Sequence, residues 1–156
     1  MNRLIRYAVL AGLGVLVAMQ FIRPARTNPA TEPSRTLGAT MSVPASVQAV
    51  LDRSCRDCHS NDTRWPWYSN LAPMSWMVID HVNSGRRHFN YSEWATYTPD
   101  TSRKVLHDIC EETRQGSMPV GSYTLVHREA RLSEADIQTL CAWTASALAP
   151  VVSHGR

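Results

Sequence analysis

The chain has 156 residues and a mass of 17.5 kDa, which is room for one compact domain and a tail but not for two enzyme domains. Hydrophobic residues make up 44% and charged residues 19%, so most of the chain is expected to fold. The net charge of +3 comes from residues 1–43, which carry five Arg and one Glu; residues 44–156 carry eleven basic and twelve acidic residues. This nearly neutral main part offers no basic surface for phosphate backbones, and we expect no nucleic-acid partner.

The first segment, residues 1–22, has the pattern of an export signal. Two arginines precede an apolar run over residues 7–22, and Arg23 ends that run. As a helix with a rise of about 1.5 Å per residue, the run spans about 24 Å, short of a hydrocarbon core of roughly 30 Å. Arginine side chains at both ends can bridge the difference by snorkelling. Because no small-x-small cleavage site follows Ile22, we favour an uncleaved membrane anchor over a removed signal peptide.

The second segment, residues 23–43, contains three prolines, several Ser and Thr residues and almost no apolar periodicity. Such a composition is typical of an extended or disordered linker. We therefore expect the folded domain to occupy residues 44–150, held away from the membrane by this tether.

Two of the four cysteines stand in the run Cys55-Arg56-Asp57-Cys58-His59, which has the C-x-x-C-H spacing of c-type haem attachment. Two thiols at this spacing reach the two vinyl groups of one porphyrin, and the next residue, His59, becomes the proximal iron ligand. A redox dithiol or half of a zinc site also uses a C-x-x-C pair. The first needs a β-α-β setting and the second needs another ligand pair at close spacing, and the sequence has neither. We expect one covalent haem c, bound through Cys55, Cys58 and His59.

The other two cysteines, Cys110 and Cys141, lie 31 residues apart on the apolar sides of two expected helices. Covalent haem attachment takes place after export, so the resemblance of this motif to c-type haem proteins implies a domain on the periplasmic side of a bacterial inner membrane, and the apolar leader agrees with it. In that oxidising compartment the two thiols can form a disulfide. Two buried free thiols, packed as small hydrophobic side chains, fit the sequence equally well.

The apolar periodicity predicts helices throughout the domain and no strand, which makes the fold class all-α. The expected helices run from about residue 44 into the haem motif, over 75–84, over 102–115 and over 133–148. The second is expected to end at Gly85, and the last to begin with a capping box of Ser133 and Asp136. Its expected buried stripe is Ile137, Leu140, Cys141, Thr144 and Leu148, with Trp143 on the flank. Eight of the twelve aromatic residues fall between residues 65 and 97, where they form core or cover a porphyrin.

The sixth iron ligand is less determined by the sequence. We favour Met118, because Gly116 and Pro119 beside it build a sharp, stiff turn that can hold a thioether against the iron. The position can also remain vacant, or be filled by another of the methionines and histidines: Met74, Met77, His81, His88, His107, His127 and His154. Among these, His127, His81 and Met74 are the main competitors. Three arginines are candidates to pair with the haem propionates, or are solvated surface residues: Arg64, Arg86 and Arg87.

The stretch from Leu51 to Tyr68, with Cys58-His59-Ser60-Asn61 and Trp65-Pro66-Trp67-Tyr68, resembles the bacterial haem-binding domain family of small, membrane-tethered, c-type haem proteins. Further segments that carry the resemblance are Ala72-Pro73-Met74-Ser75-Trp76, His81-Val82, Gly85-Arg86, Asn90-Tyr91-Ser92-Glu93-Trp94, Met118-Pro119, Tyr123, His127 and Leu132-Ser133. The resemblance covers about residues 44–148. It implies covalent haem with His59 as one ligand and Met118 as the opposite one, in a cytochrome c-like fold. Where many relatives have His-Pro, this chain has His127-Arg128.

These features favour a one-electron carrier that serves a redox partner protein at the membrane. An iron with His and Met ligands has no free site for a substrate, and the thioether raises its reduction potential. The alternative is a ligand-binding or sensory haem protein with an open or displaceable distal site and weak peroxidase activity. No hydrolase or transferase motif stands out, so we do not expect an enzyme of those classes.

Overall fold

The computed structural model describes residues 2–149, and every regular element in that range is a helix. The α-helices are α1 (Arg3–Met19), α2 (Leu37–Thr40), α3 (Ala45–Ser54), α4 (Arg56–His59), α5 (Met74–His88), α6 (Pro99–Arg114), α7 (Gly121–Val126) and α8 (Glu134–Leu148). Four short 3-10 helices complete the list: η1 (Pro33–Arg35), η2 (Trp67–Asn70), η3 (Tyr91–Thr96) and η4 (Arg128–Ala130). The all-α prediction is confirmed for this part of the chain. His154 and the expected domain end at residue 150 lie outside it.

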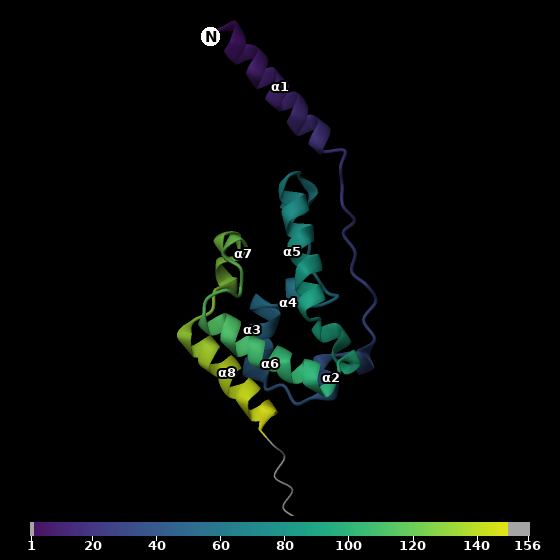
Figure 1. Ribbon diagram of the computed structural model, residues 1–156, viewed down its shortest axis with the longest axis vertical. Helices are drawn as coiled ribbons and strands as arrows, with labels where there is room; N and C mark the ends of the chain where they lie inside the picture. Colours follow the sequence, from purple (N-terminus) through teal and green to yellow (C-terminus); the bar gives the residue numbers. More distant parts are fainter. Residues whose placement is uncertain (1, 150–156) are drawn as a thin grey trace, which may run out of the picture.

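The hydrophobic core lies at the base of the molecule, where α6 and α3 pack against α8 (Figure 1). Its buried side chains include Val50 from α3, Leu106 from α6, and Leu140 and Trp143 from α8. A disulfide between Cys110 and Cys141 joins α6 to α8, which decides between the paired and the free thiols that the sequence allows. These contacts make the base a rigid platform for the elements above it.

Two arms rise from this base, α5 in the centre and the short α7 beside it, and α4 lies between their lower ends (Figure 1). α5 packs against α4 and η2, whereas α7 packs against η4. The arms thus border a space whose floor carries the haem motif.

Three of the predicted helices have different bounds in the structure: α6 begins at Pro99, three residues before the expected start, and the first two differ more. The first is broken at Cys55, whose φ of −122° interrupts the helix and separates α3 from α4. The second does not end at Gly85: α5 continues to His88, and Gly85 is buried inside it. Gly116, by contrast, has the left-handed φ of 73° that the predicted turn after α6 requires.

The last helix follows the prediction closely. The Ser133 hydroxyl accepts from the Asp136 N–H and the Asp136 carboxylate accepts from the Ser133 N–H, which is the expected capping box. Trp143, however, is not on the flank: it is 5% exposed and its indole N–H donates to the Ser42 carbonyl at 3.1 Å. A partner from outside the helix therefore draws this side chain into the core.

The N-terminal segment forms the helix α1, whose side chains are exposed along nearly its whole length. Among residues 2–149, no helix combines the length and the apolar character that crossing a bilayer requires. The membrane-spanning anchor therefore stays a prediction that this finding does not support.

Residues 23–43 are not a disordered tether. Residues 33–43 contain η1 and α2, and Leu37 is 4% exposed within the hydrophobic core, so the folded domain begins before residue 44. Residues 23–32 are extended, but side chains hold them against the domain: Asn28 donates to the Thr63 carbonyl at 2.9 Å and Arg86 donates to the Thr27 carbonyl at 2.8 Å. We call residues 20–32 the strap. Composition alone missed it because its partners come from distant parts of the chain.

Candidate functional site

The C-x-x-C-H motif folds as the junction of α3 and α4, with Cys55 at the break and Cys58 and His59 in α4. Neither Cys55 nor Cys58 is part of a disulfide. Burial raises the pKa of the Cys55 thiol to about 12 and that of the Cys58 thiol to about 11, so both are protonated at neutral pH. The three motif residues thus belong to a single turn of helix and its N-cap.

Gly85 allows this turn to lie against α5. A β-carbon built on Gly85 would stand 2.5 Å from the Cys58 carbonyl oxygen, closer than real β-carbons approach any atom. Only glycine therefore lets α5 pack directly on the backbone of the haem motif.

The imidazole of His59 is 7% exposed and has a fixed orientation. Its Nδ1 lies 3.1 Å from the Phe89 carbonyl oxygen, and its ring stacks on the Phe89 ring with the centroids 4.0 Å apart. A carbonyl accepts only, so Nδ1 carries the proton and the Nε2 lone pair is left for a metal. Burial lowers the pKa of His59, against smaller opposing effects of hydrogen bonds to Phe89 and Gly85, and keeps the ring neutral.

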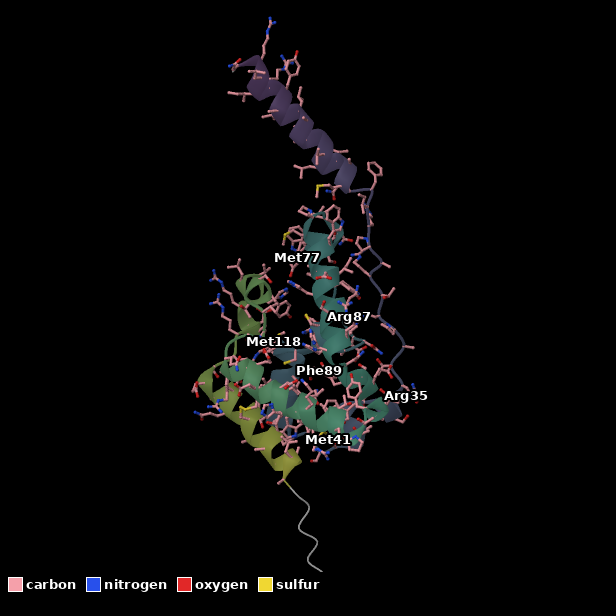
Figure 2. The ribbon with its side chains drawn as sticks, in the orientation of Figure 1. Arg35, Met41, Met77, Arg87, Phe89 and Met118 are labelled. Carbon is pink, nitrogen blue, oxygen red and sulfur yellow. A yellow bond between two sulfur atoms is a disulfide. The ribbon has the colours of Figure 1, made fainter. Side chains whose placement is uncertain are left out.

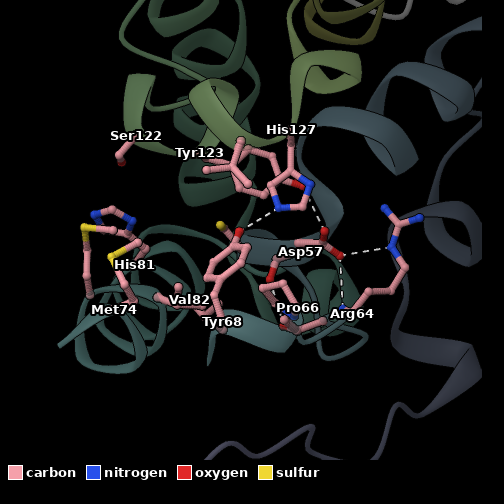
Figure 3. Close-up of a pocket in the computed structure, with 15 residues that line it drawn as sticks. Asp57, Arg64, Pro66, Tyr68, Met74, His81, Val82, Ser122, Tyr123 and His127 are labelled. Carbon is pink, nitrogen blue, oxygen red and sulfur yellow. Dashed lines mark hydrogen bonds and ion pairs between the residues drawn. The ribbon is translucent and has the colours of Figure 1, made fainter. Parts of the chain in front are cut away.

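A groove of about 510 Å³, including the part open to solvent, lies between the two arms beside Cys58. The α5 wall is formed by Met74, Met77, Val78, His81 and Val82, and the α7 side by Ser122, Tyr123, Val126 and His127. Figure 3 shows Met74 and His81 on one side of the groove, with Tyr68 and His127 on the other. Only about 40 Å³ of this space can hold the centre of a water molecule, so the groove is narrow. Its mostly apolar walls, rather than its volume, are what it shares with cofactor sites.

Asp57, inside the haem motif, connects α4 to the α7 arm. Its carboxylate accepts from the Tyr123 hydroxyl at 2.8 Å and from the Arg64 backbone and side chain at 3.1 and 3.2 Å (Figure 3). The Tyr123 ring stacks on His127, whose Nε2 lies 2.7 Å from the Tyr68 hydroxyl. Burial, followed by the Asp57 charge, raises the pKa of Tyr123, so this phenol remains a donor. The network closes the α7 side of the groove.

Some candidates for the sixth iron ligand line the groove, and others lie outside it. Met74, His81 and His127 line the groove, and His127 is already engaged by Tyr68. Met118 is half-buried at the foot of the α7 arm and is not among the lining residues (Figure 2). Its role as a ligand stays a prediction.

The three arginines considered for propionates have protein partners. Arg64 is paired with Asp57, and Arg87 donates to Ser84 at 2.7 Å. Arg86 joins α5 to two other segments. Its guanidinium donates to the Ser60 carbonyl and the Thr63 hydroxyl, which follow the haem motif. It also donates to the Thr27 carbonyl and the Asn28 side chain, which belong to the strap. Arg86 is thus a structural clamp rather than a solvated surface residue.

The aromatic residues between residues 65 and 97 are only partly core, and their role in covering a porphyrin stays a prediction. Trp94 is buried in the core, Tyr68 lines the groove, and Trp67 is 74% exposed. Sequence analysis missed the bonds that Asp57 makes to Tyr123 and Arg64. It interpreted Gly85 as a helix end, whereas Gly85 is a packing contact for Cys58. The one signal that could have revealed the role of Asp57 is a carboxylate placed between the two cysteines. Nothing near Gly85 in the sequence reveals its contact with Cys58.

The residues present fit a haem. The two unpaired thiols belong to the same motif as an imidazole whose Nδ1 proton is bonded to the Phe89 carbonyl, and one of the thiols borders an apolar groove. Cys110 and Cys141 are consumed by their disulfide and do not complete a zinc site with the motif.

Comparison with known proteins agrees with this geometry. The family model described as haem-binding domain matches residues 14–146, a range that includes the strap and the end of α1. Neither the curated proteins nor the solved structures contain a match to the chain. With most of its length matched, the chain belongs to the haem-binding domain family and is a haem-binding protein.

Proposed function

We propose that the protein is a c-type cytochrome that carries single electrons on the periplasmic side of a bacterial inner membrane, with Cys55 and Cys58 bonded to haem and His59 on its iron. The observation that carries this proposal is the bond from His59 Nδ1 to the Phe89 carbonyl, which fixes the imidazole in the tautomer that binds a metal through Nε2, in the same motif as two free thiols. When bound, haem supplies one-electron chemistry at its iron. The helical platform around the motif is compatible with a cytochrome c-like fold.

An oxidising location is supported by the Cys110–Cys141 disulfide, because such bonds persist mainly outside the cytosol. The exposed apolar surface of α1 supports attachment to a membrane. The test of attachment is fractionation: the protein should remain with membranes in high salt and leave them in detergent.

Covalent attachment is tested in cells equipped for haem c maturation. The exported wild-type protein should keep its colour on a denaturing gel stained for haem. The variant Cys55→Ala/Cys58→Ala should be colourless, whereas Cys110→Ala/Cys141→Ala, which removes the disulfide outside the motif, should remain coloured. A coloured Cys55→Ala/Cys58→Ala variant would overturn the proposal.

For the sixth ligand we propose Met118, which Gly116 and Pro119 hold at the foot of the α7 arm. An iron ligated on both faces leaves the reduced spectrum unchanged when carbon monoxide is added. We expect this insensitivity in the wild type and its loss in Met118→Ala, with Met77→Ala as the matched control.

The second candidate function is that of a ligand-binding or sensory haem protein. It is favoured by the openness of the groove and by the absence of Met118 from its lining. A complete and prompt carbon monoxide shift in the wild-type protein would establish an open or displaceable site and favour this function over electron transfer.

A further inference from the structure

Exposed apolar side chains gather where α1 meets the groove. We call this set the apolar rim: Phe21, Ile22, Trp67, Leu71, Met74 and Met77. Phe21 is 84% and Trp67 74% exposed, and both methionines also line the groove. Apolar surface of this extent on one end of a small protein is typical of an interaction site.

The strap fixes the direction in which α1 leaves the domain. The Gln20 side chain donates to the Ala72 carbonyl and accepts from the Ala72 N–H, both at 3.0 Å. The Trp76 indole N–H donates to the Ile22 carbonyl at 2.8 Å. These three bonds hold the end of α1 beside the start of α5, and in Figure 1 α1 departs from the same end of the molecule as the tip of α5.

The charges beside the rim are positive. Arg23 and Arg26 are exposed on the strap directly after the rim residues Phe21 and Ile22. An apolar surface with a partly polar Trp, next to arginines, matches the boundary between acyl chains and anionic headgroups.

We infer that the apolar rim lies on the lipid surface to which α1 attaches, so that the Met74 and Met77 edge of the groove contacts the bilayer. The inference rests on the proposed membrane attachment and adds an orientation to it. Its consequence is that an electron partner reaches this edge from within or along the membrane. A freely diffusing protein would approach other faces.

The test uses the full-length, haem-loaded protein in vesicles of phosphatidylcholine and phosphatidylglycerol that contain a phospholipid with a photoreactive diazirine in its acyl chain. After illumination, lipid adducts are located by mass spectrometry of peptides. We expect adducts in α1 and in residues 67–77, and none in residues 99–104 at the start of α6. Adducts confined to α1 would overturn the inference while leaving membrane attachment intact. If no peptide of the protein carries a lipid adduct, the proposed membrane attachment is overturned together with the inference.

The variant Gln20→Ala tests the fixed orientation. It removes both bonds to Ala72 without touching a buried side chain, so labelling of residues 67–77 should fall about threefold while labelling of α1 is unchanged. The matched control is Gln138→Ala, since within residues 2–149 the Gln138 side chain bonds only to Glu134, inside α8. Equal labelling in both variants would overturn the orientation. A stable dimer that shields the rim from lipid would assign the rim to a second copy and also overturn the inference.

Discussion

Gly85 in α5 packs directly against the backbone of Cys58: a β-carbon on Gly85 would approach the Cys58 carbonyl oxygen to 2.5 Å and its β-carbon to 3.0 Å. This contact places the haem motif against the longer arm of the groove. The close packing of α5 on the haem motif therefore depends on the absence of one side chain.

The variant Gly85→Ala should therefore be destabilised, because the atoms that would clash are backbone and cannot move aside cheaply. We expect the free energy of unfolding to fall by about 1–3 kcal/mol, measured by urea denaturation of the haem-free protein. The control is Gly38→Ala in α2, where nothing lies within 4 Å of the added carbon and helix propensity favours Ala. Equal stability of the two variants would contradict the packing described here.

The α7 arm is connected to the haem motif through Asp57 and Tyr123, which are 66 residues apart in the sequence. Tyr123→Phe removes the donor to Asp57 and keeps the ring that stacks on His127. Because both groups are only partly buried, we expect a loss of about 1 kcal/mol in unfolding free energy. Faster amide exchange in α7 should accompany it. Tyr7→Phe, on exposed α1, should change neither quantity, and exchange in α7 that matches the wild type would exclude the connection.

Leu37 distinguishes a folded N-terminal segment from a disordered tether. Its side chain is 4% exposed in the core, so Leu37→Ala should lower the free energy of unfolding by about 2–3 kcal/mol. Leu125→Ala is the matched control, because Leu125 is 70% exposed and should cost less than about 0.5 kcal/mol. A tether would give the same small effect at both positions.

Local sequence signals predicted the features whose causes are local. The capping box at Ser133, the left-handed turn at Gly116 and the spacing of Cys55, Cys58 and His59 each depend on neighbours within a few positions. The capping box and the turn are found as expected, whereas the helix expected to run into the haem motif is broken at Cys55, and covalent haem attachment remains a proposal.

The features that sequence analysis missed are set by distant partners. Gln20 bonds to Ala72 across 52 positions, and Trp143 to Ser42 across 101. A glycine after an apolar helix pattern predicts a helix end, which is how Gly85 was interpreted. The actual reason for a glycine there is the backbone of Cys58, which leaves no room for a β-carbon and is not visible in the local sequence. Composition predicted a linker over residues 23–43. The bond that holds Thr27 to Arg86 uses the Thr27 backbone carbonyl, which every residue type has, so composition cannot reveal it.

Asp136 should make the stability of the fold depend on pH under acidic conditions. Burial acts to raise the pKa of this carboxyl, but hydrogen bonds from Ser133 and the interaction with Arg53 at 2.9 Å outweigh it and hold the pKa below its usual value. A lowered pKa in the folded state means that the unfolded chain binds the proton more tightly. The contribution is therefore complete above about pH 4 and is lost as the pH falls through the folded-state pKa.

Asp136→Ala should consequently cost about 1 kcal/mol of unfolding free energy at neutral pH, through loss of the cap at the start of α8. The difference from the wild type should shrink below about pH 4, where the native carboxyl also becomes protonated. Chemical denaturation at a series of pH values measures both effects. The control is Asp80→Ala, an exposed aspartate on α5, which should change stability little at any pH. A cost for Asp136→Ala that is the same at acidic and neutral pH would mean that the carboxylate charge does not stabilise the cap.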